Sequence, residues 1–377
     1  SVQSVNGPDV TIIRGFEDTT YPYEASMRGV FLNNGASLIG FTVTNGHASA
    51  YSGDYYYEKS GGGVFMTAGC TVSNCILTGN SARQNGGGAY LYLGGEISRC
   101  ILTSNSSLAY GGGAYLYQAG AMENCLVINN QGTYYGGGLA MDYLASVKNS
   151  TICGNSAAYG GGGCYASGGT IYNSIVWGNG GSATRFDIYG GGTHYSTCSS
   201  DVTDGVNGCI TNNPQFAGMR FDDYHLLANS PCIDQGDNAH VTTSVDLGGE
   251  PRIAGSSVDM GSYESPNSPS HIITTTVSGL GTINPDNPAV FEGNDQSFYI
   301  EAVYGYYLSS LTVDGSSIPL ASSHTFSNVQ STHTISALFA TDPHSLSVEN
   351  GTGDGMYDIY TEVPVTADAG SAGFGFS

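Results

Sequence analysis

Basic side chains are scarce in this chain. Its 377 residues include nine Lys and Arg against 31 Asp and Glu, which gives a formal net charge of −22. A charge of this sign repels nucleic-acid phosphates and anionic lipid headgroups, so we expect no nucleic-acid partner. No run of 18 apolar residues occurs, so we expect no direct membrane insertion by this stretch of chain. Patterned sequence starts at Val2 without a Met, which indicates a piece of a longer protein.

Helix-forming residues are also few, whereas glycine and tyrosine are abundant. The chain has two lysines and 11 glutamates, but 27 tyrosines and 57 glycines. Glycine follows no Gly-X-Y period and proline is limited to 12 residues, which excludes collagen and disfavours a low-complexity linker. The composition therefore predicts an all-β protein.

A 25-residue repeat organises the first half of the chain. Gly-Gly-Gly occurs at 61–63, 86–88, 111–113 and 136–138, and a four-glycine run follows at 160–163. Each repeat holds short alternating runs separated by Gly, Ser and Asn, and no segment is long enough for a helix pair. This period predicts a right-handed parallel β-helix with coils of about 25 residues, stacked about 4.8 Å apart.

Equivalent residues should lie above one another in such a stack. We expect the glycines to occupy turns with positive φ. An asparagine ladder should hydrogen-bond along the stack, with each asparagine also suited to a left-handed turn. Its members are Asn80, Asn105, Asn130 and Asn155.

Period-2 alternation after each glycine run assigns side chains to faces. Val64 and Met66 share the parity that should point inward. The opposite parity predicts an aromatic stripe on the outer surface, suited to stacking on sugar rings or on a partner protein, or simply to mutual stacking. The aromatic stripe comprises Phe65, Tyr90, Tyr92, Tyr115, Tyr117 and Tyr165. A second strand should turn an apolar stripe outward as an interface with another chain or with the C-terminal module; it comprises Ile76, Ile101, Leu126 and Ile175.

Nine cysteines are an odd number, so at least one thiol cannot pair within the chain. Cys75, Cys100 and Cys125 are vertical neighbours at a spacing that a disulfide could span, but inward thiols also pack well, and we favour a reduced ladder. If a disulfide forms, we expect it among Cys198, Cys209 and Cys232. The spacing of the cysteines and eight histidines disfavours a zinc site.

Two sets of motifs resemble known bacterial surface proteins. The Gly-Gly-Gly-[Val/Ala/Leu]-[Phe/Tyr] and [Leu/Val/Ile]-x-x-Asn elements across 29–180 resemble the repeats of polymorphic outer-membrane-protein-type β-helix adhesins. Asn213-Pro-Gln-Phe216, Ser230-Pro-Cys-Ile-Asp-Gln-Gly236 and Asp259-Met-Gly-Ser-Tyr-Glu264 are similar to the end of the choice-of-anchor Q class of secreted β-helix proteins. The second resemblance implies capping coils at about 181–265 in an exported, envelope-associated protein.

The acidic residues of this cap surround a single arginine, which suggests a network in which one guanidinium offsets several carboxylates. The alternative is that the acidic 181–265 region binds calcium, and the sequence does not specify any other metal. The cap network comprises Asp234, Asp246, Arg252, Asp259 and Glu264.

The composition changes after a linker at 266–270, so we expect a β-helix over 1–265 and separate modules beyond it. Residues 271–340 lack Lys, Arg and Cys and should form a small β-sandwich-like module. Gly279-Leu-Gly-Thr-Ile-Asn-Pro285 and His333-Thr-Ile-Ser-Ala-Leu-Phe339 resemble the internalin B-repeat. Residues 345–377 echo the same motifs as an incomplete second module.

Catalysis on the coils is not expected, because only Glu96, Glu123 and Asp142 are acidic between 60 and 180 and they occupy different columns. The remaining candidate groups are Asp54, Glu58 and Lys59, and Arg185 and Asp187 with His194, which we interpret as solvated loops.

The sequence therefore predicts a secreted bacterial cell-surface protein with an adhesive or structural role and no enzymatic activity or cofactor. Its expected partners are glycans, other surface proteins or copies of itself. One alternative is a polysaccharide-binding or -degrading β-helix enzyme; another is a self-assembling extracellular filament or sheath subunit.

Overall fold

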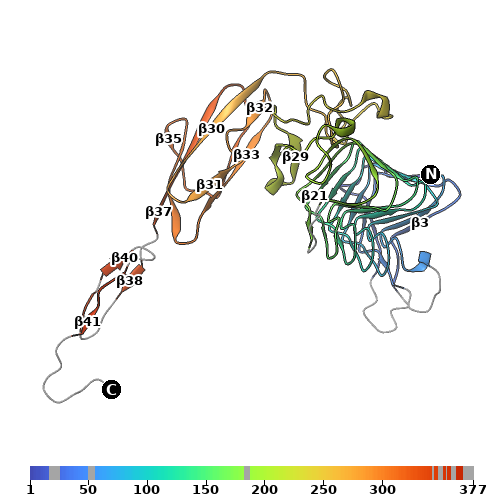
Figure 1. Ribbon diagram of the computed structural model, residues 1–377, viewed down its shortest axis with the longest axis horizontal. Helices are drawn as coiled ribbons and strands as arrows, with labels where there is room; N and C mark the ends of the chain where they lie inside the picture. Colours follow the sequence, from blue (N-terminus) through green and yellow to red (C-terminus); the bar gives the residue numbers. More distant parts are fainter. Residues whose placement is uncertain are drawn as a thin grey trace, which may run out of the picture. The chain divides into compact units, whose positions relative to one another are not determined.

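The computed structural model describes residues 1–16, 26–49, 56–181, 187–341, 344–346, 351–353, 355–357 and 362–367 (Figure 1). The chain divides into two compact units. The first contains Ser1–Phe216 and Tyr224–Asn267, and the second contains Ala217–Asp223 and Ser268–Ser377. The division after Asn267 falls inside the expected linker. In the part of the chain that the structure describes, no helix has the length and apolar character needed to cross a membrane.

The first unit is a parallel β-solenoid with coils of about 25 residues, which confirms the predicted fold class (Figure 1). Three sheets run along it. The first consists of β3 (Val30–Leu32), β7 (Val64–Thr67), β11 (Ala89–Tyr92), β15 (Ala114–Leu116), β19 (Leu139–Met141), β23 (Cys164–Ala166) and β26 (Ile188–Gly190).

The second sheet has 14 strands in two rows that the long strand β24 joins. One row consists of β1 (Val2–Gln3), β4 (Ser37–Ile39), β8 (Thr71–Ser73), β12 (Glu96–Ser98), β16 (Ala121–Glu123), β20 (Ser146–Lys148) and β24 (Thr170–Trp177), with β27 (Thr193–Cys198) also paired to β24. The other row consists of β21 (Thr151–Cys153), β17 (Leu126–Ile128), β13 (Ile101–Thr103), β9 (Ile76–Thr78), β5 (Thr42–Thr44) and β2 (Ile12–Arg14).

The third sheet has the shortest strands. It consists of β6 (His47–Ala48), β10 (Ser81–Ala82), β14 (Ser106–Ser107), β18 (Gln131–Gly132), β22 (Ser156–Ala157) and β25 (Gly180–Gly181). Single 3₁₀ turns lie at η1 (Tyr56–Glu58), η2 (Val206–Gly208), η3 (Met219–Phe221) and η4 (Asn238–His240), and β28 (Phe216–Gly218) pairs with β29 (Asp223–Leu226).

Strand register follows the sequence period. Ala89 pairs with Val64 on one side and with Ala114 on the other. The side chains of Val64 and Met66 are fully buried, as the alternation predicts, and the core runs continuously from Leu32 to Ile188. Because every coil repeats the same inward positions, the hydrophobic core is a column rather than a sphere.

The glycine runs allow both a turn with positive φ, which was predicted, and a close approach of neighbouring coils, which was not. Only the first residue of each triplet has the expected positive φ, for example 62° at Gly86. The second glycine lies where successive coils approach most closely, and a Cβ at Gly87 would come within 2.1 Å of the carbonyl oxygen of Ser106. The central glycines are therefore required by the close approach of the coils and not by a turn.

The asparagine ladder hydrogen-bonds along the stack as predicted. The Nδ2 of Asn80 donates to Oδ1 of Asn105 at 2.9 Å, and the same bond links Asn105 to Asn130 and Asn130 to Asn155. The expected left-handed conformation of these residues is wrong, because positive φ falls one residue earlier, as at Ser104.

The ladder ends on an acidic residue, Asp187, which was not predicted to belong to it. The ladder continues through Asn179, whose Nδ2 donates to Oδ1 of Asp187 at 3.0 Å. Asp187 was expected in a solvated loop, but its side chain is buried and its other carboxylate oxygen accepts from the Ser200 hydroxyl at 2.7 Å. Burial raises its pKa.

All nine cysteines are buried and unpaired. In the column of Cys75, Cys100 and Cys125, the backbone N–H of Cys75 donates to Sγ of Cys100 at 3.4 Å. Burial raises the pKa of the Cys100 thiol, so this thiol stays protonated.

The second unit contains two sheets that share one core, centred on Phe298, Leu311 and Ile335. One sheet has the order β32 (Ala289–Phe291), β30 (Ser270–Ser278), β37 (His333–Thr341), β34 (Tyr306–Val313) and β35 (Ser316–Ser317). The other has the order β31 (Gly281–Asn284), β33 (Gln296–Ala302) and β36 (Ser323–Phe326).

Much of 345–377 lies outside the described residues. In this region β38 (His344–Leu346) pairs with β40 (Gly355–Tyr357), and β39 (Gly351–Thr352) pairs with β41 (Thr366–Ala367).

Candidate functional site

The outer side of the sheet β3–β26 carries a connected network of aromatic rings, which we call the aromatic face. Its ring centroids lie between 5.0 and 6.5 Å apart. Fourteen described residues form it: Phe31, Tyr57, Phe65, Tyr90, Tyr92, Tyr110, Tyr115, Tyr117, Tyr134, Tyr135, Tyr143, Tyr159, Tyr165 and Tyr189.

The stacking arises directly from strand register. Phe65 pairs with Phe31 on one side and with Tyr90 on the other, and Tyr90 pairs in turn with Tyr115. Neighbouring coils therefore hold these outward side chains at the distance at which rings interact. Such aromatic pairs contribute about 0.5–1.5 kcal/mol each beyond the area that they bury.

Two members of the predicted aromatic stripe are not on the surface. Phe65 is 2 % exposed and Tyr90 is 4 % exposed, so their expected role in binding is wrong. The ring of Phe65 is covered by Phe31 and Tyr57, and the guanidinium of Arg28 lies 5.0 Å from its centroid.

The remaining members of the aromatic stripe are accessible. Tyr92, Tyr115, Tyr117 and Tyr165 are each partly exposed. They are the part of the predicted stripe that a ligand could reach.

The most exposed tyrosines of the aromatic face were not predicted. Tyr134, Tyr143 and Tyr159 are exposed to 46 %, 63 % and 56 %. Two of them belong to the coil segments that precede the glycine runs, where Tyr134 and Tyr159 lie 25 residues apart. That spacing is a signal in the sequence, but it lies before each glycine run, outside the alternating residues from which the aromatic stripe was predicted.

A carboxylate lies within the aromatic face. Asp142 directly follows β19 and occupies the column of Tyr117, one coil further along the stack. The phenol of Tyr115 donates to Oδ2 of Asp142, and the hydroxyl of Ser167 donates to Oδ1. Burial, followed by the hydrogen bond to Asp142, raises the pKa of Tyr115, so the phenol remains protonated and keeps donating.

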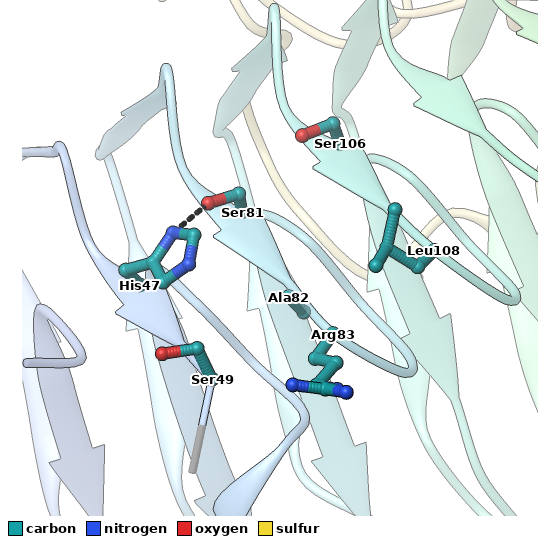
Figure 2. A pocket seen from close by; sticks show the side chains of 7 residues that line it. All are labelled: His47, Ser49, Ser81, Ala82, Arg83, Ser106 and Leu108. Atoms are coloured by element: carbon teal, nitrogen blue, oxygen red, sulfur yellow. Dashed lines mark hydrogen bonds between the residues drawn. The ribbon is translucent and has the colours of Figure 1, made fainter. Parts of the chain in front are cut away.

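Apart from the aromatic face, a groove of about 600 Å³ lies over the short strands β6, β10 and β14 (Figure 2). Figure 2 shows Nδ1 of His47 hydrogen-bonded to the hydroxyl of Ser81, with Ser106 on the next strand. Arg83 and Leu108 line the same groove, together with Ser49 and Ala82. The described lining contains no carboxylate, so its chemistry is that of hydroxyl groups, one imidazole and one guanidinium. His47, Ser81 and Ser106 share one column, which was not predicted because His47 precedes the first Gly-Gly-Gly run of the repeat.

Two of the four residues of the predicted apolar stripe are covered by their own unit, which corrects the expected interface with another chain or with the C-terminal module at those positions. Leu126 and Ile175 are buried in a cluster with Phe216, Leu226 and Met260. These covering residues come from the predicted capping region. Ile76 and Ile101 remain partly exposed.

A polar residue, Thr151, lies between Leu126 and Ile175 in the column of the apolar stripe. Thr151 is buried there, and its Oγ1 accepts from the backbone N–H of Ser262 at 3.0 Å. The capping segment therefore attaches to the coils through this hydrogen bond as well as through apolar contacts.

The predicted cap network forms around Arg252, whose side chain is buried. Its Nη1 donates to Oε2 of Glu264 at 3.2 Å, and its Nη2 donates to the backbone carbonyl oxygens of Asp259 and Gly261 at 3.0 and 2.6 Å. Although Arg252 favours the ionised form of Glu264, burial outweighs it and raises the pKa of Glu264 to about 7.

The other cap carboxylates are acceptors for backbone N–H groups. Asp246 accepts from Gly249 and Glu264, Asp259 accepts from Asp234, and Asp234 accepts from Ser257. Among the described residues, no group of three or more His, Cys, Asp or Glu side chains is arranged to hold a metal ion. The geometry of this cluster is that of a structural hydrogen-bond network.

Of the other candidate carboxylates, Glu123 meets the capping region, where it accepts from the backbone N–H of Thr242 at 3.2 Å. Glu123 is buried and accepts from Asn149 Nδ2 at 3.1 Å, whereas Glu96 is exposed in the neighbouring strand, two positions away in register. Asp54 and Arg185 lie outside the described residues.

Comparison with protein-family models, with curated proteins and with solved structures finds no match to this chain. What can be said of its function therefore rests on the geometry above and on the motifs in its sequence.

Proposed function

We propose that this chain belongs to a secreted bacterial protein of the cell envelope, and that its role is adhesive: it binds glycans through the aromatic face without altering them. The proposed location is supported by the motifs that resemble polymorphic outer-membrane-protein-type adhesins, choice-of-anchor Q proteins and internalin B-repeats. Other surface proteins and further copies of this chain are the partners against which the proposal must be tested.

The aromatic face carries this proposal. So many aromatic rings seldom cluster on a protein surface that binds nothing. An exposed ring makes few packing contacts with other protein atoms and therefore adds little to the stability of the fold. Tyr134, Tyr143 and Tyr159 are exposed, and a tyrosine side chain carries both an apolar ring and a hydroxyl group. A sugar ring offers the matching pair of surfaces, with C–H groups on its faces and hydroxyl groups on its edge, so stacking and hydrogen bonding can form together.

The negative charge of the chain limits which glycans the aromatic face could bind. The chain has a net charge of −22, and Asp142 is the carboxylate within the aromatic face. Anionic polysaccharides should be repelled by this charge. The aromatic face therefore suits neutral or cationic glycans better than uronate or sulfated polymers.

Binding of the purified 377-residue chain to insoluble neutral polysaccharides tests the proposal. Replacing Tyr134 and Tyr159 by Ala should reduce binding at least ~10-fold, because each stacked ring contributes on the order of 1 kcal/mol. Tyr304→Ala is the matched control, since Tyr304 is an exposed tyrosine of the second unit, outside the aromatic face. Undiminished binding by the double variant, or equal loss in the control, would refute the role of the aromatic face.

A further inference from the structure

One position within the aromatic face combines a negative charge with rings that lie at an angle to one another. The ring of Tyr117 lies 5.8 Å from that of Tyr143 at an interplanar angle of 85°, and 6.1 Å from that of Tyr115 at 60°. Tyr115 also hydrogen-bonds to Asp142. The carboxylate is thus held beside rings that do not share a common plane.

The two hydrogen bonds fix the orientation of this carboxylate without neutralising it. Tyr115 and Ser167 each occupy one oxygen of Asp142 with a neutral hydroxyl donor. A carboxylate oxygen can accept a second hydrogen bond, so both oxygens retain acceptor capacity. Of the ion pairs between described residues, none involves Asp142.

Tyr143 directly follows Asp142 in the sequence, is exposed and packs edge-on against Tyr117. Its φ is 54°, in the left-handed region that disfavours residues with a Cβ, and its side chain is 63 % exposed. A ring at this corner can reach over a ligand that contacts Tyr117.

We propose that Asp142 with Tyr115, Tyr117 and Tyr143 forms a subsite for a protonated amino group, and that the ligand is a glycan containing amino sugars with free amines. This inference rests on the proposed glycan-binding function and specifies its ligand. An ammonium group is attracted both by the faces of tyrosine rings and by a carboxylate. The neighbouring rings of the aromatic face then stack on the sugar that carries the amine. A lysine side chain also carries an amine but has no sugar ring, so it would gain less from these rings.

Three soluble probes test the subsite on the purified 377-residue chain: a glucosamine oligomer, the fully N-acetylated oligomer of equal length, and a glucose oligomer. Acetylation removes the positive charge and keeps the ring, and glucose removes the nitrogen. With the amine protonated, the glucosamine oligomer should bind ~10-fold or more tightly than either of the others, because hydrogen bonds to charged groups are worth about 1.5–3 kcal/mol. Added salt should weaken this preference.

Asp142→Asn should remove the preference for the glucosamine oligomer, because the amide keeps the size of the side chain and lacks its charge, and retained binding of the glucose oligomer shows that the variant is folded. Glu96→Gln is the matched control, because Glu96 is an exposed carboxylate on another sheet of the same solenoid. Its preference should equal that of the unaltered chain.

Equal binding of all three oligomers, or an undiminished preference in Asp142→Asn, would overturn the subsite while leaving the glycan-binding proposal intact. If lysine oligomers bind as tightly as the glucosamine oligomer, the assignment to an amino sugar is wrong. If no glycan binds, the proposed function itself fails, and the subsite fails with it.

Discussion

Removing one side chain from the middle of the asparagine ladder should destabilise the solenoid more than removal of any exposed polar side chain. The side chain of Asn105 accepts from the backbone N–H and the Nδ2 of Asn80 at 3.0 and 2.9 Å. Its own Nδ2 donates to the carbonyl of Leu77 at 2.8 Å and to Oδ1 of Asn130 at 3.0 Å. All of these bonds are classed as buried.

The cost can be worked out from what each partner retains. In Asn105→Ala, Nδ2 of Asn80 keeps its bond to the carbonyl of Val43, and Oδ1 of Asn130 still accepts from the backbone of residue 105. The backbone N–H of Asn80 loses the partner that the structure gives it, whereas the carbonyl of Leu77 also lies in the parallel ladder between β9 and β13. One unsatisfied buried N–H costs about 1–3 kcal/mol, so the variant should lose at least that much unfolding free energy.

Urea unfolding followed by tyrosine fluorescence measures this loss, since most tyrosines of the aromatic face belong to the same coils as the ladder. Asn6→Ala is the control, because Asn6 is exposed and, among the described residues, hydrogen-bonds through its backbone N–H and not through its side chain. A decrease of less than ~1 kcal/mol in Asn105→Ala, with an unchanged urea slope, would refute the view that the ladder bonds hold the coils together.

Three further outcomes are expected in the same unit. Gly87→Ala should cost at least ~2 kcal/mol in urea, because its Cβ would meet the Ser106 carbonyl, whereas Gly191→Ala, with no heavy atom within 4 Å, should change stability little. Since burial raises the pKa of Glu264 from 4.5 to about 7, its proton stabilises the folded state fully below pH 4.5, and that contribution is lost as pH rises through 7. Glu264→Gln should flatten the decline in urea stability between these two values, and an unchanged slope would contradict the raised pKa. The native chain should resist thiol-specific labels until it is unfolded, because its cysteines, Cys100 among them, are buried; rapid labelling of the native chain would contradict this.

The fold was predictable because each coil is specified by the same few positions. A period of 25 set the strand register, and the alternation after each glycine run placed Val64 and Met66 inward without knowledge of any long-range contact. The ladder was predictable for the same reason, since a polar residue repeated at the coil period must meet its own copy.

What the period could not predict is how much of an outward side chain is covered. Phe65 and Tyr115 occupy the same column, yet Phe65 is buried and Tyr115 is partly exposed. The difference arises from Phe31 and Tyr57, which lie in the less regular N-terminal segment and pack on Phe65. Exposure depends on neighbours outside the repeat, and the repeat carries no information about them.

The burial of the apolar stripe follows the same logic and bears on where function can reside. Leu126 and Ile175 are outward on their own coils, but the capping region folds back over them, so these positions contribute to stability and are withdrawn from binding. In the part of the chain that the structure describes, Tyr134, Tyr143 and Tyr159 of the aromatic face stay exposed. In the described chain the cap thus packs against the apolar stripe, whereas exposed rings remain on the aromatic face. This contrast, more than the number of tyrosines, makes the aromatic face the better candidate for binding a ligand.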